Sequence, residues 1–163
     1  MDFDYVTEQG FWICFIVAVL TFGLSAFAGS ILVGSFEGLF FFLAGVGVRQ
    51  RSRVAALAAF SAYLLSGLVL QRYTGNGFGV ARIIALALLL ANVRASWMTA
   101  RWESESEPAL LPPGPLQTIG DKISDQLPAF LWPKTRFVFY LLAAVEISLL
   151  LLSLVVPARN ESN

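Results

Sequence analysis

The sequence predicts an all-α integral membrane protein, a bundle of about five transmembrane helices with one short amphipathic cytoplasmic helix. Three observations predict this class. Charged residues make up 13% of the 163 residues, about half of the roughly 25% that is usual in soluble domains. The mean hydropathy is +0.72, and long apolar segments recur along the chain. This composition argues against a soluble enzyme, a disordered tail and a nucleic-acid-binding protein.

The first two predicted spans come from one long apolar stretch. Between Phe11 and Val48 the only charged residue is Glu37. A single helix over this stretch would measure about 57 Å, whereas the hydrocarbon core of a bilayer is about 30 Å thick. The stretch must therefore fold into two helices.

Small residues mark the break between these two helices. They are Gly29, Ser30, Gly34 and Ser35. We place the first span at 10–28 and the second at 31–48. A start at Phe36 is the alternative for the second span, and it would leave that span short.

Three further spans follow, at 54–70, 78–98 and 137–156. A compact basic loop precedes the third span and contains Arg49, Arg51 and Arg53. A turn rich in glycine separates the third span from the fourth. The start of the chain has no basic region and its apolar stretch is long, so we expect a retained span and not a signal peptide.

The predicted organisation has three parts: a four-span membrane bundle (1–102), a cytoplasmic linker with an amphipathic helix (103–133), and a fifth transmembrane helix with a short outer tail (134–163). Apolar residues of the linker recur at spacings of three and four, which is typical of one helix face. They are Leu116, Ile119, Ile123, Leu127 and Phe130. We expect Pro128 to end this helix.

The distribution of basic residues predicts the orientation. Eight of them fall on the side of the N-terminus: Arg49, Arg51, Arg53, Arg94, Arg101, Lys122, Lys134 and Arg136. Three fall on the other side: Arg72, Arg82 and Arg159. The positive-inside rule then places the N-terminus in the cytoplasm and the C-terminus outside.

Four polar residues inside the spans are candidate sites: Glu37, Arg82, Asn92 and Glu146. Glu37 and Arg82 lie about 16 and 18 Å above the cytoplasmic ends of their spans, so they can meet. An isolated charge at that depth costs at least about 2.5 kcal/mol, which pairing would reduce. A structural salt bridge, or snorkelling to the outer interface, is the favoured interpretation, and an ion or proton path is the alternative.

Glu146 lies about 15 Å from the start of the fifth span, close to the bilayer midplane. A carboxylate there must face the bundle, and several polar side chains are candidate partners: Tyr63, Ser66, Arg82 and Asn92. A protonated or paired glutamate that fastens the fifth helix is favoured. A proton-carrying role is the alternative.

Other residues point to packing and not to chemistry. Gly34 and Gly38 form a GxxxG pattern, which favours close helix packing within the bundle, with a dimer contact as the alternative. The chain has no histidine and one cysteine, Cys14, so neither a histidine-dependent catalytic or metal site nor an intrachain disulfide is expected. We expect no catalytic residue, no metal and no cofactor.

Several motifs resemble those of small uncharacterised bacterial four-span inner-membrane proteins, over about residues 11–102. They are FEGLF at 36–40, GVRQRSRVAAL at 47–57, YTGNGFG at 73–79 and NVRASW at 92–97. The last departs from the pattern, with Ala95 and Ser96 in place of Gly and Thr and no histidine after them. The resemblance implies a bacterial inner (plasma) membrane and no activity.

Three functions compete on these grounds. A non-enzymatic auxiliary or scaffold subunit, acting through contacts with another membrane protein, is favoured. An oligomeric small transporter or channel subunit is the alternative, with the buried Glu and Arg residues in an ion or proton path. A membrane enzyme is least supported, because no nucleophile and base cluster together. The lipid bilayer is the one partner that all three share.

The basic loop generates a first prediction. Replacing Arg49, Arg51 and Arg53 by glutamine leaves five basic residues against three, so we expect a mixed topology of the second and third spans. Protease accessibility of the loop in sealed vesicles measures it. Unchanged accessibility would show that the remaining charges set the orientation.

Overall fold

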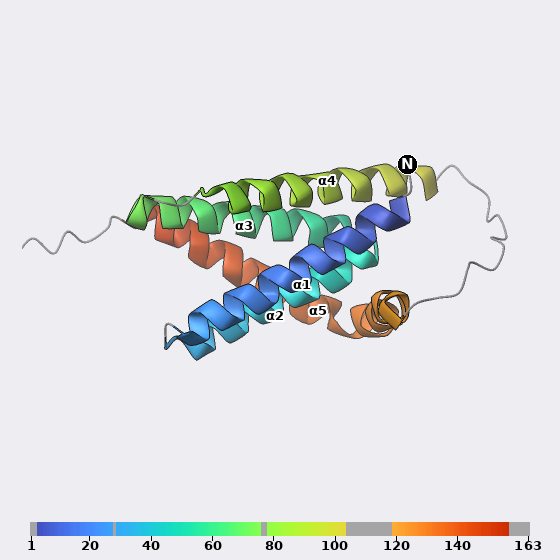
Figure 1. The fold of residues 1–163 in the computed structure, drawn as a ribbon, viewed down its shortest axis with the longest axis horizontal. Coiled ribbons are helices and arrows are strands. Elements are labelled where there is room, and N and C mark those ends of the chain that lie inside the picture. Colours follow the sequence, from blue (N-terminus) through green and yellow to red (C-terminus); the bar gives the residue numbers. More distant parts are fainter. Residues whose placement is uncertain (1–2, 28, 76–77, 104–118, 157–163) are drawn as a thin grey trace, which may run out of the picture.

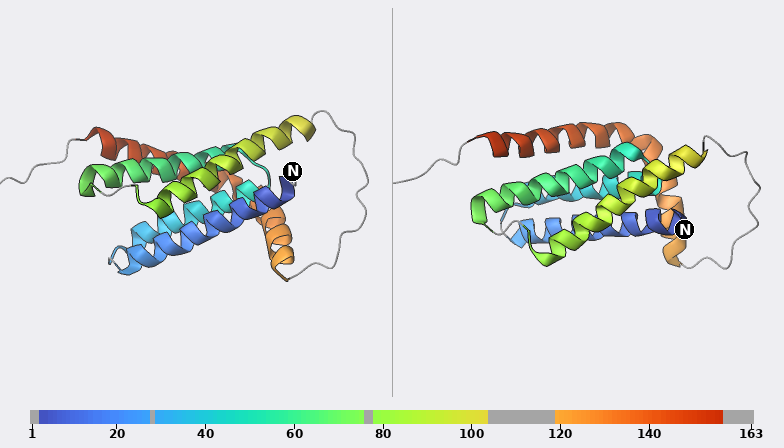
Figure 2. Two further views of the ribbon diagram at one scale, coloured as in Figure 1. Left: turned by 45° about the horizontal axis from the view of Figure 1, so that its top comes forward. Right: turned by 90° about the horizontal axis from the view of Figure 1, so that it is seen from above.

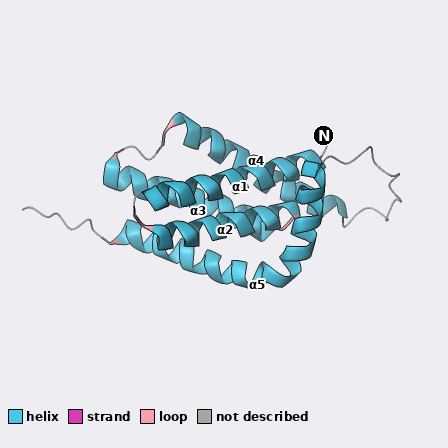
Figure 3. Ribbon diagram, turned by 60° about the horizontal axis from the view of Figure 1, so that its bottom comes forward, coloured by secondary structure: helices cyan, strands magenta, loops and turns pink. Residues whose placement is uncertain are grey.

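The computed structural model describes residues 3–27, 29–75, 78–103 and 119–156. They form five helices: α1 (Phe3–Phe27), α2 (Ile31–Arg49), α3 (Arg53–Thr74), α4 (Val80–Glu103) and α5 (Ile119–Val155) (Figure 1). No strand occurs among these residues (Figure 3). Each helix contains a segment long and apolar enough to cross a membrane, which confirms the predicted all-α bundle of five such segments.

The break between the first two helices falls at Gly29. This residue has φ +76°, a left-handed conformation that glycine adopts at little cost and that commonly ends helices. The backbone N–H of Ser30 donates to the carbonyl of Ser25 at 2.9 Å. This hydrogen bond caps the C-terminal end of α1 before α2 begins at Ile31. The start at Ile31 is confirmed, and the alternative start at Phe36 is wrong.

The connection between α2 and α3 is short, and it keeps the two helices antiparallel neighbours. The hydroxyl of Ser52 accepts a hydrogen bond from the backbone N–H of Ala55 at 3.3 Å and caps α3. α3 ends at Gly75, which again is left-handed, with φ +75°.

The helices alternate in direction, so their ends collect into two groups (Figure 2). We call the end that contains Arg49, Arg51 and Arg53 the basic end. The N-terminus of α1 and the C-terminus of α4 also lie there. The far end holds the α1–α2 and α3–α4 connections and the last turn of α5.

Helix α5 differs from the sequence prediction. Pro128 does not end a separate helix, because α5 runs unbroken through Pro128 and Pro133. A proline removes one backbone hydrogen bond and bends a helix without necessarily ending it, and the first part of α5 turns away from the rest (Figures 2 and 3). The helix able to cross a membrane begins at Pro128, earlier than the expected start at residue 137. The side chains of the predicted apolar stripe before Pro128 lie outside the described residues.

Helix α2 is the centre of the bundle and contacts α1, α3 and α5, whereas α4 rests on α1 and α3. The fully buried rings of Phe40 and Phe139 stack at 5.8 Å and join α2 to α5. On the other side of α2, glycines let α1 approach. A Cβ on Gly38 would lie 3.3 Å from the carbonyl oxygen of Ala18, and one on Gly34 would overlap the side chain of Ser25.

This close approach generates a second prediction. Gly34→Ala forces a methyl group against Ser25, and overpacking of this kind costs about 1–3 kcal/mol, so we expect a lower melting temperature in detergent. Gly23→Ala on α1 is the matched control, because nothing lies within 4 Å of a Cβ there. Equal melting temperatures of the two variants would contradict the close α1–α2 contact.

Candidate functional site

A cavity of about 370 Å³ opens inside the half of the bundle next to the far end. All five helices line it. Its polar side chains are Thr21 and Ser25 of α1, Glu37 of α2, Tyr63, Ser66 and Tyr73 of α3, Arg82 of α4, and Glu146 of α5. Polar side chains therefore gather in a cavity that lies within the apolar spans, and we call it the polar cavity.

Helical spacing explains why these side chains meet. Tyr63, Ser66 and Tyr73 lie three and seven residues apart and so share one face of α3. Glu37 and Phe41, and likewise Glu146 and Leu150, are four residues apart on α2 and α5, and all four side chains line the cavity. Glu146 is only 5% exposed, so its carboxylate belongs to the interior.

Arg82 is held against α3. Its guanidinium lies over the ring of Tyr63, 5.1 Å from the ring centroid, a cation–π arrangement. Gly67 leaves room for it, because a Cβ there would lie 3.2 Å from Nη1 of Arg82. Tyr63 in turn meets the ring of Phe41 edge to face, with centroids 6.0 Å apart. The guanidinium is thus positioned at one wall of the cavity.

The two carboxylates also line a second cavity, of about 500 Å³, between α2, α3 and α5. Its wall is otherwise mainly aliphatic and includes Val33, Val145 and Leu149. Glu37 and Glu146 therefore line both cavities, as do Val69 and Leu150.

Contacts between α3 and α5 close the far end beside the polar cavity. The guanidinium of Arg72 donates a hydrogen bond to the carbonyl oxygen of Leu154. The hydroxyl of Tyr73 donates to the carbonyl oxygen of Ser153 at 3.4 Å. These bonds join the last turns of the two helices.

Asn92 lies elsewhere, at the contact of α4 with α1. It is 3% exposed, and its side-chain amide donates to the carbonyl oxygen of Leu88 at 2.9 Å. Its Oδ1 has no hydrogen-bond partner among the described residues. A Cβ on Gly10 would overlap this oxygen, so the absence of a side chain at Gly10 lets α4 approach α1.

Three of the four candidate residues from the sequence therefore share one cavity: Glu37, Arg82 and Glu146. Tyr63 and Ser66, two of the partners considered for Glu146, line it too. The expected Glu37–Arg82 ion pair stays a prediction. Thr21, Ser25 and Tyr73 were not singled out from the sequence, although the spacing along α3 could have indicated Tyr73.

The described residues contain no group of three or more His, Cys, Asp or Glu side chains that could hold a metal ion. No protein-family model, curated protein or solved structure matches the chain. The resemblance to bacterial four-span proteins stays an expectation, and the site must be interpreted from its own geometry.

The shared cavity generates a third prediction. Glu37→Ala and Arg82→Ala should each lower the melting temperature in detergent, and the double variant should lose less than the sum. The expected coupling is about 0.5–3 kcal/mol, because neither charge is then left uncompensated. Glu37→Ala combined with Asn92→Ala is the control, since Asn92 lies at a different contact. Strict additivity for Glu37 and Arg82 would show that they do not interact.

Proposed function

We propose that this chain is a small transporter or channel subunit that binds a monovalent cation or a proton at Glu37 and Glu146. One observation carries the proposal: acidic and basic side chains from three helices line one cavity within the spans. Ionisable residues at such depth are costly and mark substrate or ion pathways in membrane proteins. This is the function that the sequence analysis ranked second.

The charges of the cavity favour a cation. Glu37 and Glu146 carry two negative charges when both are ionised, and Arg82 carries one positive charge. One proton or one monovalent cation therefore makes the site neutral, and a low-dielectric surrounding makes such compensation valuable. The other titratable groups that line the cavity are the phenols of Tyr63 and Tyr73.

The proposed location follows from the basic residues. With the basic end in the cytoplasm, the polar cavity lies in the outer half of the membrane, and the C-terminus is outside. A bacterial inner (plasma) membrane is the proposed compartment, in line with the resemblance of residues 11–102.

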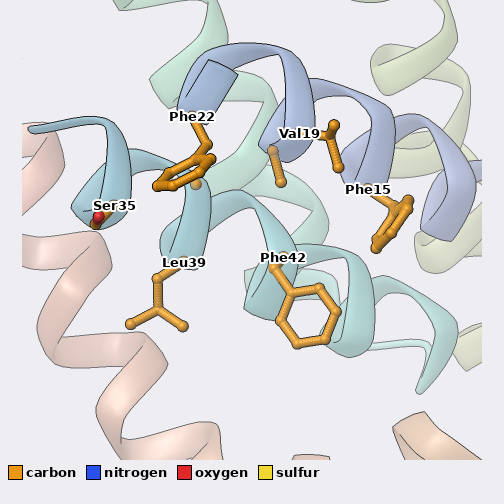
Figure 4. Close-up of a pocket in the computed structure, with 8 residues that line it drawn as sticks. Phe15, Val19, Phe22, Ser35, Leu39 and Phe42 are labelled. Carbon is orange, nitrogen blue, oxygen red and sulfur yellow. The ribbon is translucent and has the colours of Figure 1, made fainter. Parts of the chain in front are cut away.

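A second candidate, the auxiliary or scaffold subunit, is supported by a different feature. An open apolar groove of about 380 Å³ lies between α1 and α2 (Figure 4). The rings of Phe15, Phe22 and Phe42 border it, together with Leu39. Such a groove suits a helix of another membrane protein or of a second copy, although lipid chains can fill it equally well.

A flux measurement tests the proposed transport function. In proteoliposomes with an entrapped pH dye, the native protein should carry protons or exchange them for a cation under an imposed gradient. Glu146→Gln keeps the shape and the hydrogen bonding of a protonated acid but cannot titrate. We therefore expect native-like thermal stability and loss of flux.

Two variants make this experiment decisive. Glu8→Gln, which removes a carboxylate near the start of α1, should keep the native flux. Glu146→Leu also removes the titratable group and should abolish flux as well. Full flux by Glu146→Gln would overturn the proposal and would favour the scaffold function, which is then examined by the co-purification of a partner.

A further inference from the structure

We propose that the ligand is an organic cation with an apolar body, whose charged centre lies between Glu37 and Glu146 and whose body lies in the aliphatic cavity between α2 and α5. The inference rests on the proposed function of these two carboxylates and names the class of substrate that they take. The observation behind it is that the same two acidic residues line both cavities.

The shared position of the carboxylates is the first step. Glu37 and Glu146 line both the polar cavity of about 370 Å³ and the aliphatic cavity of about 500 Å³. A ligand held by them therefore meets the polar side chains of the first cavity and the mainly aliphatic side chains of the second. A molecule with a charged head and an apolar body matches both sides, whereas a bare ion matches only one.

The aliphatic cavity lies beside the outer surface of the bundle. Leu32 is 87% exposed and Leu149 is 52% exposed on the surface of the bundle, and this surface belongs to spans able to cross a membrane. The cavity thus adjoins the surface that lipid would cover. An apolar body dissolved in the bilayer can enter from there without crossing water.

The charges around the two carboxylates also favour a cationic ligand. Two acids, Glu37 and Glu146, line the same two cavities, and Glu146 is almost completely buried. A cation between the two side chains would interact with both. The guanidinium of Arg82 is turned to the ring of Tyr63, while Phe36 and Phe41 add aromatic rings to the two walls, which are favourable neighbours for an organic cation.

Contacts at either end of the cavities indicate where the ligand enters. The bonds from Arg72 and Tyr73 of α3 to backbone carbonyls of α5 cross the end of the bundle beside the polar cavity. On the side of the carboxylates toward the basic end, the rings of Phe40 and Phe139 stack between α2 and α5. We therefore place the entry from the membrane at the aliphatic cavity, which α2 and α5 line.

A pair of probes with the same shape and opposite charge tests the inference. Tetraphenylphosphonium should bind the purified full-length protein in detergent, measured by calorimetry, and tetraphenylborate should not. Glu37→Gln and Glu146→Gln should each weaken tetraphenylphosphonium binding by at least about tenfold, because a buried charge loses one of its partners. Glu8→Gln should bind like the native protein.

Two further variants separate binding from folding. Arg82→Gln removes a repelling charge, so it should bind tetraphenylphosphonium more tightly than the native protein, whereas damage to the fold would weaken binding. Leu149→Trp fills the aliphatic cavity and should weaken binding. Leu152→Trp, on the same helix but outside both cavities and 57% exposed, should not.

The outcomes distinguish the substrate class from the transport function. Equal binding of both probes, or binding that is unaffected by Glu37→Gln and Glu146→Gln, would overturn the inference. Proton flux that depends on Glu146 without any binding of tetraphenylphosphonium would overturn it too and would leave the proposed function standing. Weaker binding in vesicles that contain an amine lipid, phosphatidylethanolamine, than in vesicles of an uncharged galactolipid would identify the lipid headgroup as the source of the cation.

Discussion

The central position of α2 is the constraint on which the rest of the bundle depends. It is the most buried of the five spans, and its two sides are packed in different ways. Glycines such as Gly34 and Gly38 bring the backbone of α1 close, and the ring of Phe40 stacks on Phe139 of α5. Because lipid provides little hydrophobic drive between helices, close packing of this kind holds them together. A polar residue on α2, such as Glu37, therefore lies in the interior of the bundle.

The cavity follows from an uneven filling of the space around α2. Toward the basic end, large rings occupy the interior, and Trp132 extends the stack of Phe40 and Phe139. Toward the far end, small polar side chains such as Ser25 and Ser66 lie among the rings, and Glu37 and Glu146 contribute their carboxylates. Small side chains cannot fill the distance between helices, so a polar hollow remains.

The sequence predicted the spans well, because a length of about 20 apolar residues is a strong physical requirement. It also indicated that Glu37, Arg82 and Glu146 lie deep in the membrane. It gave several candidate partners for Glu146 without separating Asn92 from those that line the cavity, since rotation of each helix about its axis depends on packing with the others. The path of α5 through Pro128 was missed for a related reason: a proline costs one hydrogen bond, and contacts elsewhere along the helix can outweigh it.

The question that decides between a scaffold and a carrier is whether Glu146 is needed to hold α5 in place. Other contacts already hold it: Phe139 is fully buried on Phe40, Ala143 belongs to the same core, and the last turn is bonded to Arg72. Apolar side chains of similar volume are often as stabilising as buried charges, or more so. Packing alone therefore gives no reason for an acid at the centre of this span, next to a second acid. An opposite charge beside it does give one, from Arg82 in the same cavity and from the cation that the proposed function adds.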